Sequence, residues 1–189
     1  MDAQPAEQVS LQYVSGNFFQ GLGALPVVGR PFRDEDDRVG AEPAVIVSHR
    51  FFVRQLGGRE DALDRGVRVN NVPARIVGVA PPGFFGPRAG QWPDIYAPLA
   101  IKVAFEPPQG ANAPRGEDDR NWWILQIGRL KRDVPETMAR TQIARLFRNM
   151  AVPEGMKADS AKIPELITLP GRGGFYALNV KEAKALWIL

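Results

Sequence analysis

The chain has 189 residues, with 24 lysines and arginines against 21 aspartates and glutamates, one histidine and no cysteine. The lack of thiols excludes a disulfide framework, a cysteine nucleophile and a cysteine-ligated metal site. A single histidine excludes a multi-histidine metal centre. The length suits one domain of about 100–200 residues or two interleaved subdomains. The net charge of +3 is weak evidence for a nucleic-acid partner.

Hydropathy predicts a chain that is soluble as given. No stretch approaches the roughly 18 apolar residues needed to span a bilayer. Residues 1–5 lack the basic region and apolar core of a signal peptide. Residues 185–189 end on an apolar run, which predicts a terminal strand, a helix end or the cut edge of a longer segment.

The first third of the chain predicts two strands separated by a loop. Residues 11–19 read as a strand that runs into a turn at residues 15–17. Residues 21–37 are rich in glycine, proline and charge, so they predict a loop with one short turn. The apolar run at residues 44–47 is typical of a buried strand.

A helix is predicted over about residues 49–56. Ser48 can cap its N-terminus, and Phe52 and Leu56 lie four apart on one face. Gly57 and Gly58 end it because glycine adopts left-handed conformations readily.

A tight hairpin is predicted next. Residues 67–69 and 75–79 alternate in the manner of strands, and Asn70-Asn71 lies between them. Asparagine tolerates positive φ better than most residues, which suits a two-residue turn. Pro81-Pro82-Gly83 ends the second strand, and residues 94–99 form another short extended segment.

The second half of the chain predicts a long loop, a strand and a helix. Residues 107–121 are polar and rich in proline and glycine, so we expect a loop that is mobile unless something binds it. Trp122–Leu130 is the strongest strand candidate, with both faces largely apolar. Asp133 at the N-cap and Glu136 three residues later resemble a capping box.

The helix that follows is predicted to bury one apolar stripe and to end before Pro153. A last strand is predicted over residues 163–169, and a glycine loop over residues 170–174. The element order predicts an α+β fold, with two small sheets each covered by a helix. The stripe consists of Ala139, Ile143, Leu146, Phe147 and Met150.

No constellation of residues predicts catalysis, a metal site or a cofactor site. His49 has no identifiable acidic partner, so a surface helix residue is the default reading. The run at residues 34–37 fails the calcium-loop spacing, since Val39 and Val45 stand where glycine and glutamate are needed. Residues 171–174 lack the Lys-Ser/Thr of a phosphate loop. Two acids could still meet in space, as glycoside hydrolysis requires, but no pair is indicated.

Two surface features remain open as contact sites. Residues 129–148 are predominantly basic, and a free-standing binding module for nucleic acid or anionic surfaces would use Arg140, Arg145 and Arg148. A solvated surface is the other reading of that charge. Trp122-Trp123, beside the loop at residues 107–121, would form a contact site if exposed.

The order of short motifs resembles the MacB-like periplasmic core domain of ABC transporter permeases, in the duplicated-permease type of acidobacteria. The resemblance covers about residues 9–150. Asn70-Asn71 departs from it, because the family usually has Asn-Gly there. The motifs that carry the resemblance are Val14–Phe19, Leu22-Gly23, Gly29–Phe32, Glu35–Asp37, Ala44–Ser48, Gly57-Gly58, Val67–Pro73, Ile76–Phe84, Asp94–Leu99 and Gly128–Lys131.

The resemblance implies one domain over residues 1–189, on the periplasmic side of the bacterial inner membrane, between two membrane helices. It implies a discontinuous, porter-like subdomain over about residues 1–36 plus 108–189. A second subdomain, over about residues 37–107, would be inserted in it. The apolar end of the chain would then begin the second membrane helix.

The resemblance also implies what the domain does. It would be non-catalytic and would carry no cofactor, because ATP hydrolysis occurs on a separate cytoplasmic subunit or domain. It would dimerise with a second permease copy, contact a periplasmic adaptor and relay the ATPase cycle to export or mechanical work. No nucleic-acid partner is expected on this reading.

Overall fold

The computed structural model describes residues 7–88, 90–107, 124–151, 166–169, 171 and 186–188. The chain divides into two compact units. Unit 1 comprises Met1–Gly86 and Gly90–Gly116, and unit 2 comprises Pro87–Ala89 and Glu117–Leu189. No helix in the described ranges is both long and apolar enough to cross a membrane.

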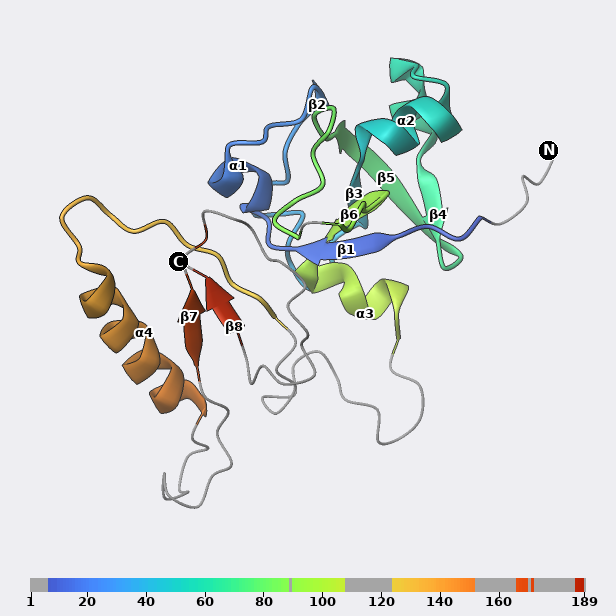
Figure 1. Cartoon of the computed structure of the whole chain (residues 1–189). Helices are drawn as coiled ribbons and strands as arrows, with labels where there is room; N and C mark the ends of the chain where they lie inside the picture. The colour runs from blue at the N-terminus through green and yellow to red at the C-terminus, as the bar shows by residue number, and fades with distance from the viewer. Residues whose placement is uncertain are drawn as a thin grey trace. The chain divides into compact units, whose positions relative to one another are not determined.

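Unit 1 is built on a six-stranded mixed sheet (Figure 1). The order is β1-β6-β3-β5, with β2 and β4 both paired to β5. β1 and β6 are parallel, as are β3 and β5, and the other pairs are antiparallel. The strands are β1 (Leu11–Val14), β2 (Val28–Gly29), β3 (Ala44–Val47), β4 (Val67–Val69), β5 (Val72–Val79) and β6 (Ile95–Pro98).

Short helices cover both faces of this sheet. Together with the mixed sheet, they confirm the predicted α+β class. The helices are α1 (Phe18–Leu22), α2 (His49–Leu56), α3 (Lys102–Phe105) and the 3-10 turns η1 (Glu60–Arg65) and η2 (Leu99–Ile101).

The N-terminal strand joins the sheet of unit 1. β1 pairs in parallel with β6, from Leu11 opposite Ile95 to Val14 opposite Pro98. This pairing connects the first strand of the chain with the last strand of unit 1.

β3 is buried on both of its faces. Val45 and Val47 pack into one core with Phe51 and Phe52 of α2 and with residues of η2 and α3. Ala44 and Ile46 point to the other core, beside Phe19 of α1. This two-sided burial explains why residues 44–47 form a continuous apolar run, and it confirms the strand predicted there.

A bulge in β5 lets a loop approach the sheet closely. The register with β3 shifts between Val45 and Ile46, so that Val45 faces Ile76 while Ile46 faces Gly78. Gly29 of β2 pairs with Gly78. A Cβ atom on Gly29 would collide with the carbonyl oxygen of Val77. The strands β2 and β5 therefore approach each other at two glycines, where neither strand has a side chain.

The predicted helix over residues 49–56 and the predicted hairpin are both confirmed. The Ser48 hydroxyl accepts a hydrogen bond from the Phe51 N–H at 3.1 Å, and Gly57 ends the helix at φ +67°. Asn70 and Asn71 form the turn between β4 and β5 at φ +48° and +67°. The asparagine pair thus supplies the positive φ values that the turn needs.

One local prediction in unit 1 is confirmed and another is wrong. The predicted strand ends at Val14 and the predicted turn at residues 15–17 follows it, but Phe18 then begins α1, where the local pattern predicts no helix. The loop expected over residues 21–37 contains the short strand β2. In both places the aromatic and apolar side chains serve the tertiary core, which the local pattern does not reveal.

Unit 2 contains α4 (Glu136–Ala151) and a parallel pair of strands, β7 (Ile167–Leu169) and β8 (Leu186–Ile188). These strands lie within the predicted strand over residues 163–169 and the apolar end of the chain. The structure thus contains two sheets, as predicted. The six-stranded sheet of unit 1 is much larger than the small sheet that we expected.

Two predictions in unit 2 are wrong. Residues 124–130, the described part of the expected strand Trp122–Leu130, contain only an isolated bridge at Ile127. Asp133 has φ +67°, so it is not an N-cap in the extended conformation, and α4 begins at Glu136. The loop at residues 108–121, Trp122-Trp123 and residues 172–174 lie outside the described residues.

We predict that Phe19→Ala lowers the free energy of unfolding by about 4 kcal/mol. Phe19 is fully buried, and its ring centroid lies 5.2 Å from that of Tyr96 and 5.5 Å from that of Phe84. The exposed Val39, at 80%, gives the control Val39→Ala, expected within about 0.5 kcal/mol. Urea unfolding measures both, and equal losses would contradict the assignment of the core.

We predict that Gly29→Ala costs about 3 kcal/mol and Gly40→Ala about 1 kcal/mol. Both glycines have positive φ, +75° and +80°, so both variants carry similar backbone strain. A Cβ atom on Gly40 meets nothing within 4 Å, whereas one on Gly29 meets the backbone of Val77. The difference between the two unfolding free energies therefore measures the close approach, and it vanishes if β2 does not pair with β5.

Candidate contact surfaces

Asp94 ties three elements of unit 1 together. Its carboxylate accepts hydrogen bonds from the Ser10 backbone N–H at 3.1 Å and from the Arg50 guanidinium at 3.0 Å. Its own N–H donates to Ser10, and its carbonyl accepts from the Ser48 N–H. The start of β1, the start of α2 and the entry to β6 are thereby fixed at one buried residue.

An aromatic pair lies on the surface beside this junction. Phe85 and Trp92 have ring centroids 4.9 Å apart. Trp92 is 51% exposed, and its carbonyl accepts a hydrogen bond from Arg50. Arg50 therefore links the aromatic pair to Asp94. An exposed tryptophan beside an arginine is the composition found at centres of protein contacts.

The acidic run at residues 34–37 has a structural role. Asp36 receives the Arg30 guanidinium at 2.6 and 3.0 Å and the Arg33 N–H at 2.7 Å. Asp37 accepts the N–H groups of Gly16 and Ala100. These two carboxylates hold loops against the sheet, and in the described part of the chain no three acidic or histidine side chains gather to hold a metal ion.

Charge and burial set the pKa of Asp36. Burial raises it, but the hydrogen bonds from Arg30 and Arg33, together with the positive charges of Arg30 and Arg75, outweigh burial. The pKa of Asp36 therefore lies below its usual value, and the carboxylate is charged at neutral pH.

His49, the single histidine of the chain, has a packing role. His49 opens α2 and has an edge contact with the Phe52 ring.

Burial, and the charge of Asp94, raise the pKa of Tyr96 above its usual value, so this phenol is neutral at physiological pH. Burial and a hydrogen bond to Glu106 also raise the pKa of Tyr13 above its usual value.

On α4, the three arginines of the alternative reading have different surroundings. Arg140 pairs with Glu136 at 2.6 Å, while Arg145 and Arg148 are exposed. The predicted apolar stripe is only partly buried. Ala139 is buried and Ile143 and Phe147 are half-buried, but Leu146 and Met150 are exposed. That part of the prediction is wrong.

Residues 2–146 match the sequence model of the MacB-like periplasmic core domain. The chain belongs to this family. It is the periplasmic domain of a MacB-like ABC transporter permease, on the periplasmic side of the inner membrane, which confirms the predicted family and location.

Two known proteins resemble this periplasmic core domain. The macrolide export ATP-binding/permease protein MacB of Chlorobaculum tepidum is 33% identical over 95 residues, which are 50% of this chain and 14% of that protein. The periplasmic region of MacB from Actinobacillus actinomycetemcomitans aligns with a TM-score of 0.48 and 18% identity, over 79% of this chain and 62% of that one. The chain thus spans only part of both relatives.

Sequence reasoning missed the Asp94 junction and the Trp92–Phe85 pair of this periplasmic core domain. Phe84 packs against Phe19 and Tyr96 in the core. Phe85 instead contacts Trp92. The available signal was a tryptophan within the Gly/Pro-rich stretch at residues 86–93, where few side chains exist to bury it.

We predict that Asp36→Asn lowers the free energy of unfolding by about 2 kcal/mol at pH 7. The lowered pKa means that the stabilisation is complete above about pH 4, the ordinary aspartate value, and is lost as the pH falls through the folded value. Unfolding curves of the wild type and the variant should therefore converge in acid. Asp34→Asn, at an exposed neighbour, should change little, and a gap that persists in acid would contradict the role of charge.

Proposed function

We propose that this periplasmic core domain performs no catalysis and couples cytoplasmic ATP hydrolysis to export or mechanical work outside the membrane. The nucleotide would be hydrolysed on a separate subunit or domain. The relative from Chlorobaculum tepidum is named as an ATP-binding/permease protein for macrolide export.

The observation that carries the proposal is the two-sided packing of unit 1. Its sheet has a buried core on each face, and close-packed interiors transmit strain because they compress little. The carboxylates of Asp36 and Asp37 are engaged in holding loops. Such a unit is suited to move as a rigid body and to pass force between its ends.

We also propose that the domain acts next to a second permease copy and a periplasmic adaptor, as one periplasmic core domain over residues 1–189. The exposed Trp92, stacked beside the half-buried Phe85, supports a protein contact on unit 1.

We predict that the distance between the two copies changes with the ATPase cycle in the full-length transporter. The chain contains no cysteine, so Val39→Cys gives a single label within the domain at an exposed position. Spin–spin distances between the copies should shift by several ångströms between the nucleotide-free and the ATP-trapped states.

The control is the same label in a transporter whose ATPase cannot bind nucleotide, where no shift is expected. A label pair without a measurable distance would contradict dimerisation. A distance that stays fixed while ATP is hydrolysed would contradict coupling through unit 1.

A further inference from the structure

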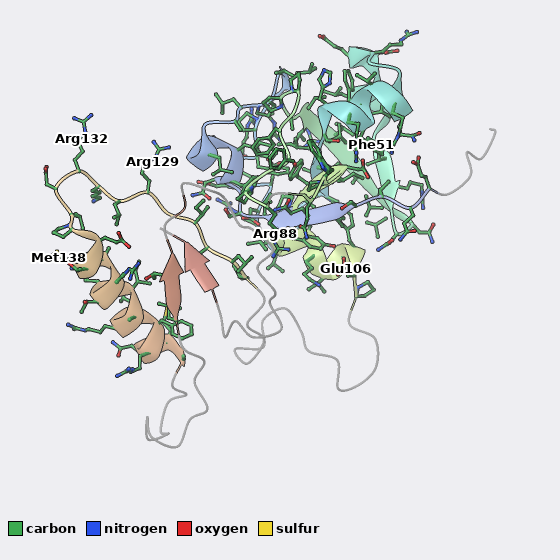
Figure 2. The ribbon with its side chains drawn as sticks, in the orientation of Figure 1. Phe51, Arg88, Glu106, Arg129, Arg132 and Met138 are labelled. Atoms are coloured by element: carbon green, nitrogen blue, oxygen red, sulfur yellow. The ribbon has the colours of Figure 1, made fainter. Side chains whose placement is uncertain are left out.

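The positive charge of the protein is concentrated in one segment of unit 2. Residues 124–151 contain six basic residues and two acidic ones, a net charge of +4, whereas the whole chain carries +3. The remaining residues together therefore carry −1. All six basic side chains of the segment are exposed, and Figure 2 shows Arg129 and Arg132 projecting outward on the same side of the stretch before α4.

The same segment exposes large apolar side chains. On α4, Met138, Leu146 and Met150 are 53%, 61% and 82% exposed. At 100° per residue these three positions fall within a 120° arc of the helix. Arg145 and Arg148 occupy the adjoining arc. α4 therefore presents an apolar edge that is buried at Ala139 and exposed at Met138, Leu146 and Met150, with arginines along one side of it.

The two arginines lack acidic neighbours along the helix. No aspartate or glutamate lies three or four positions from Arg145 or Arg148, and the two are themselves three apart. Like charges at that spacing on a helix repel. Arg140, in contrast, has Glu136 at four positions. An external anion at Arg145 and Arg148 would remove this repulsion.

We propose that α4, together with residues 129–132, docks on the anionic phospholipid headgroups of the periplasmic leaflet. A helix with exposed apolar side chains and a basic flank lies in the interface of such a surface, with its apolar edge among the acyl chains. The family assignment places the domain on the periplasmic side of the inner membrane, the compartment that this leaflet faces. The inference rests on this location and on the charges, and it is independent of the proposed coupling to ATP.

Flotation of the 189-residue protein with vesicles tests the docking. We expect binding to phosphatidylcholine vesicles that contain about 30% phosphatidylglycerol, and none to phosphatidylcholine alone. Arg145→Gln/Arg148→Gln should lower the partition coefficient about 25-fold, at about fivefold for each basic residue near the surface. The matched control Arg38→Gln/Arg68→Gln removes the same charge from unit 1 and should change it less than twofold.

The apolar edge separates a lipid surface from other polyanions. Leu146→Gln/Met150→Gln should also lower vesicle binding, whereas Val39→Gln should not. The proposal would be overturned in favour of a nucleic-acid-like polyanion by two results together. The protein would bind heparin and lose this binding in the Arg145→Gln/Arg148→Gln variant, and the Leu146→Gln/Met150→Gln variant would bind vesicles as well as the wild type. Equal binding to neutral and anionic vesicles, or no binding at all, would also overturn it.

Methionine oxidation shows whether the edge is free to bind. Exposed methionines are oxidised by dilute peroxide, and burial slows this reaction. Met138 and Met150 should react rapidly in the protein alone and several-fold more slowly with anionic vesicles. Slow oxidation without vesicles would show that other parts of the protein already cover the apolar edge. If the oxidation rate then fell as the protein concentration rose, a second copy of the chain would be what covers it. Either result would overturn lipid docking.

Discussion

The burial of β3 on both faces is the constraint on which unit 1 depends. A strand whose alternate side chains enter two different cores needs a cover on each side, and the chain supplies both covers from distant segments. α2 and α3 close one side, and α1 with the two loops that carry Phe32 and Phe84 closes the other. Removing either cover would expose half of the strand's apolar surface to water.

This arrangement gives the acidic residues of unit 1 their roles. The segments that cover the sheet come from loops, and loops need their polar groups satisfied. Asp36, Asp37 and Asp94 each accept hydrogen bonds from backbone N–H groups far along the chain or from arginines. These carboxylates therefore hold covering loops on the sheet, which suits a domain that transmits force.

Unit 2 differs in character, because its described residues expose both charge and apolar surface. Ala139 is the one buried apolar residue among them, whereas unit 1 has two buried clusters. A 16-residue helix with a wide apolar arc is stabilised chiefly by whatever covers that arc. The function of α4 thus depends on its surroundings in the transporter, and anionic headgroups are the surroundings that its arginines favour.

The sequence by itself determined the elements whose signals are local. Ser48 and Gly57 bound α2, Asn70-Asn71 forms the hairpin turn, and residues 44–47 form a buried strand. Only the tertiary structure decided where Phe18 and Phe19 belong and that β1 pairs with β6, because parallel pairing joins segments more than 80 residues apart. It also decided the exposure of Leu146, Met150 and Trp92, since helical spacing places side chains on one face and cannot say whether anything lies against it.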